Sequence, residues 1–175
     1  MTEVAGALPM RIYSAGGNIV DSSYIPTEHD YRMMDVALEQ ADLAGQNRDN
    51  PIGCVYVSPN GELEVAQTWE FRRNSLLAHA EMIGYGKIQP EAGRDLTDYS
   101  LYTIAEPCFG CAYMLDKGDI GTLFVGAKKT DAPDFFRNED TLDAIWSKTR
   151  RTLRVVSGLR AARAVEILTN YGKQH

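Results

Sequence analysis

The sequence contains few cysteines and no long apolar segment, and both features restrict the class of protein. Only three of the 175 residues are cysteine, and a chain of this length can bury a sizeable core without disulfide bonds. No apolar run approaches the roughly 20 residues that a membrane-spanning helix needs. Residues 1–10 also lack the basic segment and apolar core of a signal peptide. We therefore expect a cytoplasmic protein with no membrane partner.

Basic residues are scarcer than acidic ones. The chain has 18 Lys and Arg against 24 Asp and Glu, which gives a formal net charge of −6 at pH 7. This balance disfavours a polyanion as the main partner. One stretch is nevertheless basic, and such a cluster either holds tRNA phosphates or forms the solvated face of two helices. It contains Lys148, Arg150, Arg151, Arg154, Arg160 and Arg163.

Two short motifs contain residue types that bind zinc. The first is His79-Ala80-Glu81, and the second is Pro107-Cys108-Phe109-Gly110-Cys111. Cys108 and Cys111 lie three positions apart, so both thiolates can reach one metal ion from the first turn of a helix. A lone C-x-x-C pair also occurs in redox proteins and zinc ribbons. The additional histidine motif favours a metal site.

The three candidate ligands have no obvious fourth partner. The remaining cysteine, Cys54, lies in an apolar run that indicates a buried strand, and the other histidines are His29 and His175. A structural zinc site is closed by four protein ligands, whereas a catalytic site keeps one position for water. We therefore predict an open zinc site, where the pKa of a bound water falls to about 7.

The order H-x-E followed by P-C-x-x-C resembles the cytidine deaminase superfamily. The resemblance covers about residues 28–170. It is closest to the branch of small nucleobase deaminases, such as guanine and cytosine deaminases, and of bacterial tRNA adenosine deaminases. The segment Pro51-Ile52-Gly53-Cys54-Val55 also resembles a strand of that branch, with Cys54 in place of an alanine.

The resemblance implies roles for the motif residues. His79, Cys108 and Cys111 would hold one Zn²⁺, and Glu81 would carry protons without being a ligand. Glu81 would take a proton from the attacking water, pass it to a ring nitrogen and help the amine leave as ammonia. Backbone N–H groups around Ala80 and Cys108 would stabilise developing charge. The family also implies a homodimer.

Local patterns predict helices that alternate with strands after an initial hairpin, which is typical of an α/β protein. We expect residues 1–26 to form an extended arm and residues 27–175 to form the zinc-dependent deaminase domain. The predicted fold is a three-layer α/β/α sandwich with a mixed five-stranded sheet. The expected helices span residues 27–45, 79–87, 108–117, 141–150 and 160–171, and the expected strands span residues 51–57, 62–68, 99–104, 121–127 and 152–156.

Candidate substrate contacts lie in two loops. Relatives in the branch place an asparagine after the second predicted strand, whereas here Trp69 is followed by Glu70, and Asn74 lies four residues on. A carboxylate at this point favours a base with N–H donors, although the segment also reads as a solvated charged loop. Phe135 and Phe136 either cover the bound ring or form a small hydrophobic plug.

These observations favour a hydrolytic deaminase of a small amino-heterocycle, with purine-like rings slightly ahead of cytosine. A tRNA adenosine deaminase is the alternative within the same chemistry. A different class, a non-catalytic zinc-stabilised binding domain, stays open as well. Glu81 discriminates against this last class, because a purely structural zinc site has no need of a carboxylate there.

Overall fold

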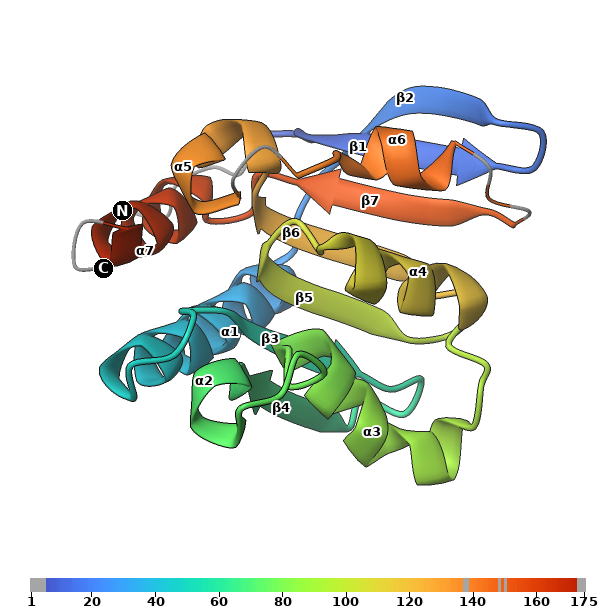
Figure 1. Cartoon of the computed structure of the whole chain (residues 1–175). Helices are drawn as coiled ribbons and strands as arrows, with labels where there is room; N and C mark the ends of the chain where they lie inside the picture. Colours follow the sequence, from blue (N-terminus) through green and yellow to red (C-terminus); the bar gives the residue numbers. More distant parts are fainter. Residues whose placement is uncertain (1–5, 137–138, 148, 150, 173–175) are drawn as a thin grey trace.

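Helices and strands alternate along most of the chain, as the sequence predicted (Figure 1). The computed structural model describes residues 6–136, 139–147, 149 and 151–172. The strands are β1 (Leu8–Ser14), β2 (Asn18–Tyr24), β3 (Gly53–Val57), β4 (Leu63–Gln67), β5 (Ser100–Ala105), β6 (Thr122–Ala127) and β7 (Leu153–Ser157). The helices are α1 (Glu28–Gln46), α2 (Glu70–Arg73), α3 (Ala80–Ala92), α4 (Phe109–Lys117), α5 (Pro133–Phe136), α6 (Leu142–Trp146) and α7 (Ala161–Gly172).

The strands form one mixed sheet in the order β2-β1-β7-β6-β5-β3-β4. Strands β5, β6 and β7 are parallel, and the remaining neighbours are antiparallel. Because β3 runs opposite to β5, the start of β3 lies at the same end of the sheet as the carboxyl end of β5. The carboxyl ends of parallel strands are where open α/β sheets bind ligands.

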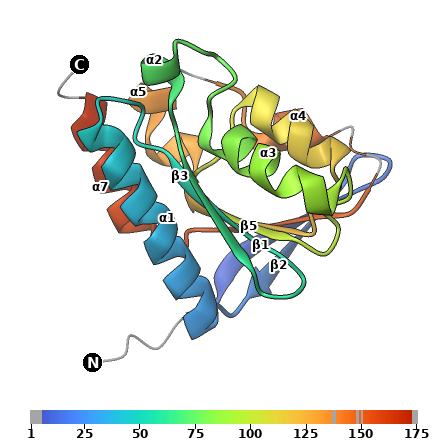
Figure 2. The ribbon, with the colours of Figure 1, turned by 90° about the horizontal axis from the view of Figure 1, so that it is seen from below.

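Helices cover both faces of the sheet, which confirms the three-layer α/β/α sandwich. Figure 2 shows α1 and α7 on one face, and α3 and α4 on the other. A hydrophobic core lies on each face of the sheet, and successive residues of β5 point into opposite cores. Tyr102 and Ile104 pack with α1 and α7, whereas Leu101 packs with α3 and α4. None of the helices in the described part of the chain is long and apolar enough to cross a membrane.

Helix α1 begins where the sequence predicted. Thr27 is the N-cap, and a reciprocal pair of hydrogen bonds joins it to Asp30. The buried Asp30 carboxylate also accepts hydrogen bonds from the hydroxyls of Tyr24 (3.0 Å) and Tyr102 (2.7 Å). One carboxylate therefore joins the end of β2, the start of α1 and the middle of β5.

Helix α1 packs closely on β3 at Gly53. A Cβ atom at this glycine would lie 2.3 Å from the carbonyl oxygen of Ala37 and 2.5 Å from the amide nitrogen of Ala41. Both atoms belong to the backbone of α1 and cannot move independently of the helix. The glycine of the Pro51–Val55 motif is therefore required by packing.

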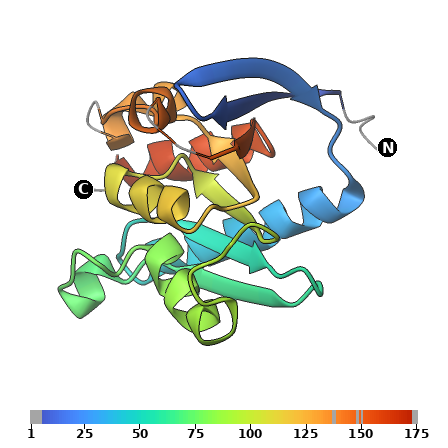
Figure 3. The ribbon, with the colours of Figure 1, turned by 90° about the vertical axis from the view of Figure 1, so that its right-hand side faces the viewer.

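The prediction of a five-stranded sheet was wrong, because the described residues form a sheet of seven strands. The extended arm expected at residues 1–26 contains the hairpin of β1 and β2, which pairs with β7 (Figure 3). Arg11 and Tyr13 of β1 bond to Asp143 of α6. Strand β2 is an edge strand with almost every residue exposed, so it lacks the apolar alternation that identifies a strand in sequence.

The bounds of several shorter elements differ from the predicted ones. The helix predicted over residues 79–87 continues to Ala92 as α3, with Pro90 inside its last turn. A proline inside a helix removes one backbone hydrogen bond and usually marks the helix end, which is why residues from Gln89 onward were predicted as a loop. The segments predicted as loops contain the short helices α2 and α5. Helix α6, predicted over residues 141–150, spans only Leu142–Trp146.

Candidate active site

Two helix N-termini meet at the predicted metal ligands. His79 is the N-cap of α3 and Cys108 is the N-cap of α4, and neither side chain caps its own helix. Cys111 lies one turn into α4 and is buried. Helix N-termini carry partial positive charge, which favours thiolates over thiols. The local structure therefore turns all three donor groups toward one point.

The three donor atoms fit a tetrahedral zinc ion. They all lie within 4.8 Å of one another, and His79 Nδ1 lies 3.4 Å from Cys108 Sγ and 3.5 Å from Cys111 Sγ. Zinc bonds of about 2.3 Å to sulfur and 2.0–2.1 Å to nitrogen at the tetrahedral angle require an N···S separation of about 3.6 Å. His79, Cys108 and Cys111 are thus positioned to bind a metal ion.

The electrostatics of this cluster favour a thiolate. Hydrogen bonds from Cys111 and His79 outweigh burial and lower the pKa of Cys108 to about 3. The hydrogen bond with Cys108, together with burial, raises the pKa of Cys111 well above its ordinary value. The cluster therefore favours a thiolate at Cys108, and a cation bound there would favour the thiolate of Cys111 too.

Glu81 lies in the same cavity as the metal donors. Its carboxylate is buried, with Oε1 accepting a hydrogen bond from Thr103 Oγ1 (3.0 Å) and Oε2 lying 3.5 Å from Cys111 Sγ. The backbone carbonyl of Glu81 accepts a hydrogen bond from the Tyr56 hydroxyl at 2.9 Å. Burial raises the pKa of Glu81 above its ordinary value. Such a carboxyl group takes up a proton more readily than an exposed one, which suits a group that must accept and return a proton.

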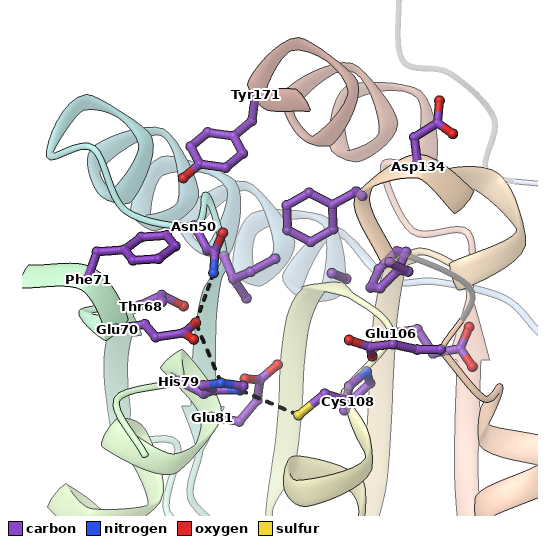
Figure 4. A pocket seen from close by; sticks show the side chains of 16 residues that line it. Asn50, Thr68, Glu70, Phe71, His79, Glu81, Glu106, Cys108, Asp134 and Tyr171 are labelled. Carbon is purple, nitrogen blue, oxygen red and sulfur yellow. Dashed lines mark hydrogen bonds and ion pairs between the residues drawn. The ribbon is translucent and has the colours of Figure 1, made fainter. Parts of the chain in front are cut away.

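The cavity above the metal donors has a volume of about 620 Å³, within the range of small-molecule sites. It opens at the carboxyl end of β5, and Figure 4 shows its side chains. The described lining residues are Asn50, Ile52, Thr68, Glu70, Phe71, His79, Glu81, Ala105, Glu106, Pro107, Cys108, Asp134, Phe135, Phe136, Glu139 and Tyr171.

Three of the five predicted substrate contacts line this cavity. Glu70 reaches it from α2, and Phe135 and Phe136 reach it from α5. Asn74 does not line it, because this residue ends α2 in the left-handed conformation (φ 46°) and is exposed. The side chain of Ala80 is fully buried in the core beneath α3, so only its backbone is near the site.

Glu70 is held by specific contacts. Its Oε2 accepts a hydrogen bond from Asn50 Nδ2 at 2.9 Å and lies 3.7 Å from His79 Nε2 (Figure 4). Arg72 and Arg73, in contrast, are exposed and lie over the ring of Trp69. The expected charged loop is therefore a short helix with its carboxylate in the pocket and its arginines in solvent.

Sequence reasoning missed Asn50 and Glu106. Asn50 precedes β3 and reaches Glu70 because β3 pairs with β4. The predicted hairpin brings the two segments together, but it does not mark the Asn50 side chain as the partner of Glu70. Glu106 lies beside the cysteine motif, and its two oxygens accept hydrogen bonds from the backbone N–H groups of Lys129 (2.9 Å) and Leu142 (2.7 Å). These contacts fix both ends of the segment that carries α5 over the pocket.

The basic stretch near the C-terminus is largely neutralised in its described part. Arg151 pairs with Asp119, Arg160 forms two hydrogen bonds to Asp35, and Arg163 contacts Asp42 and Glu166. Lys148 and Arg150 lie outside the described residues. The ion pairs disfavour a phosphate-binding patch. The alternative of a solvated face of two helices was wrong in its placement, because Arg151 precedes β7, Arg154 lies on β7, and among the described residues of the stretch only Arg163 lies in a helix, α7.

Residues 27–127 match the model of the cytidine and deoxycytidylate deaminase zinc-binding region, which is more than half of the chain. The chain belongs to the cytidine and deoxycytidylate deaminase family. This confirms the resemblance drawn from the two motifs, and the matched region contains all three metal donors and Glu81.

Relatives within this deaminase family include tRNA-specific adenosine deaminases. The protein of Rickettsia bellii is 30% identical over 94 residues, which are 52% of this chain and 65%, slightly less than two thirds, of the Rickettsia protein. The protein of Streptococcus pyogenes serotype M18 is 27% identical over 154 residues, which are 86% of this chain and 94% of that protein.

Solved structures of the family share the fold. One, from a study of A-to-I editing by tRNA:A34 deaminases, is 26% identical with a TM-score of 0.63 and covers 78% of this chain and 98% of that chain. The guanine deaminase of Nitrosomonas europaea has a TM-score of 0.67 at 19% identity and covers 82% of this chain and 84% of that chain. At that identity the second likeness concerns the fold alone.

Proposed function

We propose that this protein is a zinc-dependent hydrolytic deaminase of a small amino-heterocycle, which is a nucleobase, a nucleoside or a related ring. The observation that carries the proposal is the buried carboxylate of Glu81 beside three metal donor atoms in a cavity of suitable size. A purely structural metal site has no use for a buried carboxylate, because its desolvation costs free energy. This argues against the non-catalytic zinc-stabilised binding domain.

In the proposed reaction, water replaces the amino group of the ring and ammonia leaves. A zinc ion held by His79, Cys108 and Cys111 supplies a Lewis acid that acidifies water. Glu81 accepts the proton at Oε2 and donates it to a ring nitrogen, and it then assists departure of the amine. Thr103 holds the other oxygen, Oε1, and so fixes the direction of the carboxylate. Backbone N–H groups at the starts of α3 and α4, around Ala80 and Cys108, stabilise developing negative charge.

Deamination of adenosine in tRNA is the second candidate. It is favoured by the named tRNA-specific relatives and disfavoured by the net charge of −6 and by the ion-paired arginines near the C-terminus. An RNA substrate would make affinity fall steeply with salt concentration, whereas a free heterocycle would not.

We further propose that the protein is a homodimer that pairs through α4. Phe109 and Tyr113 lie four residues apart on this helix and are 65% and 54% exposed. Residues at this spacing share one helix face, and aromatic side chains are enriched in the cores of interfaces. A second copy of the chain would bury this face.

The test is ammonia release from a panel of aminopurines, aminopyrimidines and aminotriazines, measured for the wild type and for Glu81→Gln. We expect Glu81→Gln to keep its fold and zinc content but to lose about 10²–10⁴-fold in turnover. Glu62→Gln, in the exposed turn between β3 and β4, is the matched control. A near-wild-type rate for Glu81→Gln would refute the mechanism. Deamination of a tRNA anticodon stem-loop with no activity on any free heterocycle would establish the second candidate instead.

A further inference from the structure

We propose that Asn50 and Glu70 together form the recognition element of the pocket. They select an amino-heterocycle that presents two neighbouring N–H donors and carries no phosphate, and this substrate class rests on the deaminase function proposed above. Asn50 precedes β3 and Glu70 begins α2, and the pairing of β3 with β4 brings the two side chains together (Figure 4).

A buried carboxylate supports this element from behind. Asp49 is fully buried and accepts hydrogen bonds from the backbone N–H groups of Phe71 (3.3 Å) and Arg72 (3.2 Å) in α2. It also accepts one from the backbone N–H of Asn50 (3.0 Å). These three bonds join the first turn of α2 to the residues before β3. Glu70 and Asn50 are therefore held in register with each other.

The hydrogen bond between the two side chains fixes which atoms remain for a ligand. An ionised carboxylate only accepts hydrogen bonds, so the Asn50 amide must present Nδ2 to Glu70 and keep its oxygen, Oδ1, as an acceptor. The contacts that the described residues make with the Glu70 carboxylate, from Asn50 and His79, both use Oε2. Oε1 of Glu70 is then the second acceptor. Two neighbouring acceptors match a ring N–H beside an exocyclic amine.

The charge of the pocket excludes anionic ligands. The described lining residues include neither lysine nor arginine, and five of them are acidic: Glu70, Glu81, Glu106, Asp134 and Glu139. A phosphate near several carboxylates in a partly desolvated cavity is repelled. A zinc ion at the donor cluster would not compensate, because the two thiolates of Cys108 and Cys111 would balance its charge. An uncharged heterocycle meets no such barrier. Its ring can instead stack on the aromatic lining residues, among them Phe71 and Phe135.

The test measures binding separately from turnover. Zinc-loaded Glu81→Gln protein, which binds without turning over, is titrated by calorimetry with guanine and 1-methylguanine, a pair that differs in one N–H donor. A second pair, guanosine and guanosine 5′-monophosphate, differs only in the phosphate. Each titration is repeated with double variants that combine Glu81→Gln with Glu70→Gln, with Asn50→Ala or with the control substitution Glu62→Gln. The zinc content of every variant is measured, because Glu70 also lies near His79.

We expect guanine to bind roughly 5- to 150-fold more tightly than 1-methylguanine, the range for one buried hydrogen bond. We expect guanosine to bind at least about tenfold more tightly than its monophosphate. Glu70→Gln replaces an acceptor with a donor, so it and Asn50→Ala should bring the guanine ratio close to one, whereas Glu62→Gln should leave it unchanged. A loss of zinc would weaken the binding of both ligands of a pair equally and would not alter the ratio of their affinities.

Several results would overturn the recognition element. They are equal binding of the two bases, a ratio that survives both pocket substitutions, preferred binding of the monophosphate, or no binding of any probe. Ammonia release by the wild type is read independently. If the wild type releases ammonia but the two pocket substitutions leave the guanine to 1-methylguanine binding ratio unchanged, the recognition element is refuted and the deaminase function stands. If binding is selective but no heterocycle is turned over, only the deaminase function is refuted.

Discussion

Replacing Asp30 tests whether one carboxylate joins three parts of the fold. Asp30 is 3% exposed and accepts hydrogen bonds from Thr27 N (2.7 Å), Thr27 Oγ1 (2.8 Å), Tyr24 (3.0 Å) and Tyr102 (2.7 Å). Asp30→Asn keeps one acceptor oxygen but turns the other into a donor and removes the charge. Hydrogen bonds to charged groups are each worth about 1 kcal/mol more than neutral ones, so four bonds give a loss of about 2–4 kcal/mol.

The assay is thermal and urea unfolding of the two proteins. For a chain of this size, the expected loss lowers the Tm by about 4–16 °C. Asp35→Asn is the control on the same helix, because its ion pair with Arg160 is exposed and such pairs contribute about 0–1 kcal/mol. A change of less than about 0.5 kcal/mol for Asp30→Asn, or equal effects of the two substitutions, would refute the reasoning.

The pH dependence provides a second check on Asp30. Burial raises the pKa of this carboxyl, but the hydrogen bonds from Thr27, Tyr102 and Tyr24 outweigh it and hold the pKa below its ordinary value. The stabilisation is therefore complete above the unfolded pKa of about 3.9 and is lost as the pH falls through the lower folded pKa. The difference in stability between wild type and Asp30→Asn should be constant from about pH 7 to pH 5 and shrink below pH 4. A difference that does not shrink would contradict the assignment.

Three further predictions concern the metal, the packing and the assembly. Elemental analysis should find one zinc per chain, and His79→Ala should abolish it; a fourth side-chain ligand in an experimental structure would contradict the open site. Gly53→Ala should cost at least about 1–3 kcal/mol in urea unfolding, because its Cβ would overlap the backbone of Ala37, whereas Gly86→Ala, with no atom within 4 Å, should not destabilise α3. Light scattering should show a dimer that Tyr113→Arg converts to a monomer, and a wild-type monomer at micromolar concentration would refute the α4 interface.

The metal donors could be predicted because their signal is local. The two thiolates lie on one turn, and His79 and Cys108 each occupy the N-cap position of a helix, so residue type and spacing were sufficient. The sandwich could be predicted for a similar reason, since its central strands are apolar on both faces. These features depend little on distant parts of the chain.

The edge of the sheet and the partner of Glu70 could not be predicted in the same way. Strand β2 is exposed at an edge, and its apolar residues Ile19 and Val20 are adjacent and do not alternate with polar ones, so no strand pattern marks it in the sequence. Asn50 contacts Glu70 through the register of β3 with β4. The pairing of the β1–β2 hairpin with β7 and the contact between two side chains at the open end of the β3–β4 hairpin are tertiary properties, which local residue patterns do not reveal.

The two hydrogen bonds to Glu106 have a consequence for how this pocket could change during evolution. The backbone N–H groups of Lys129 and Leu142, at the two ends of one segment, both donate hydrogen bonds to this carboxylate, which lies next to the turn that holds Cys108. Changes of length that keep Ala132 and Phe136 in the core need not displace the sheet or the metal donors, because both ends stay bonded to Glu106 and doubling the length of a loop costs only about 0.6 kcal/mol. Insertions and deletions in this segment can reshape the mouth of the pocket, and with it the range of substrates, while the chemistry beneath stays the same.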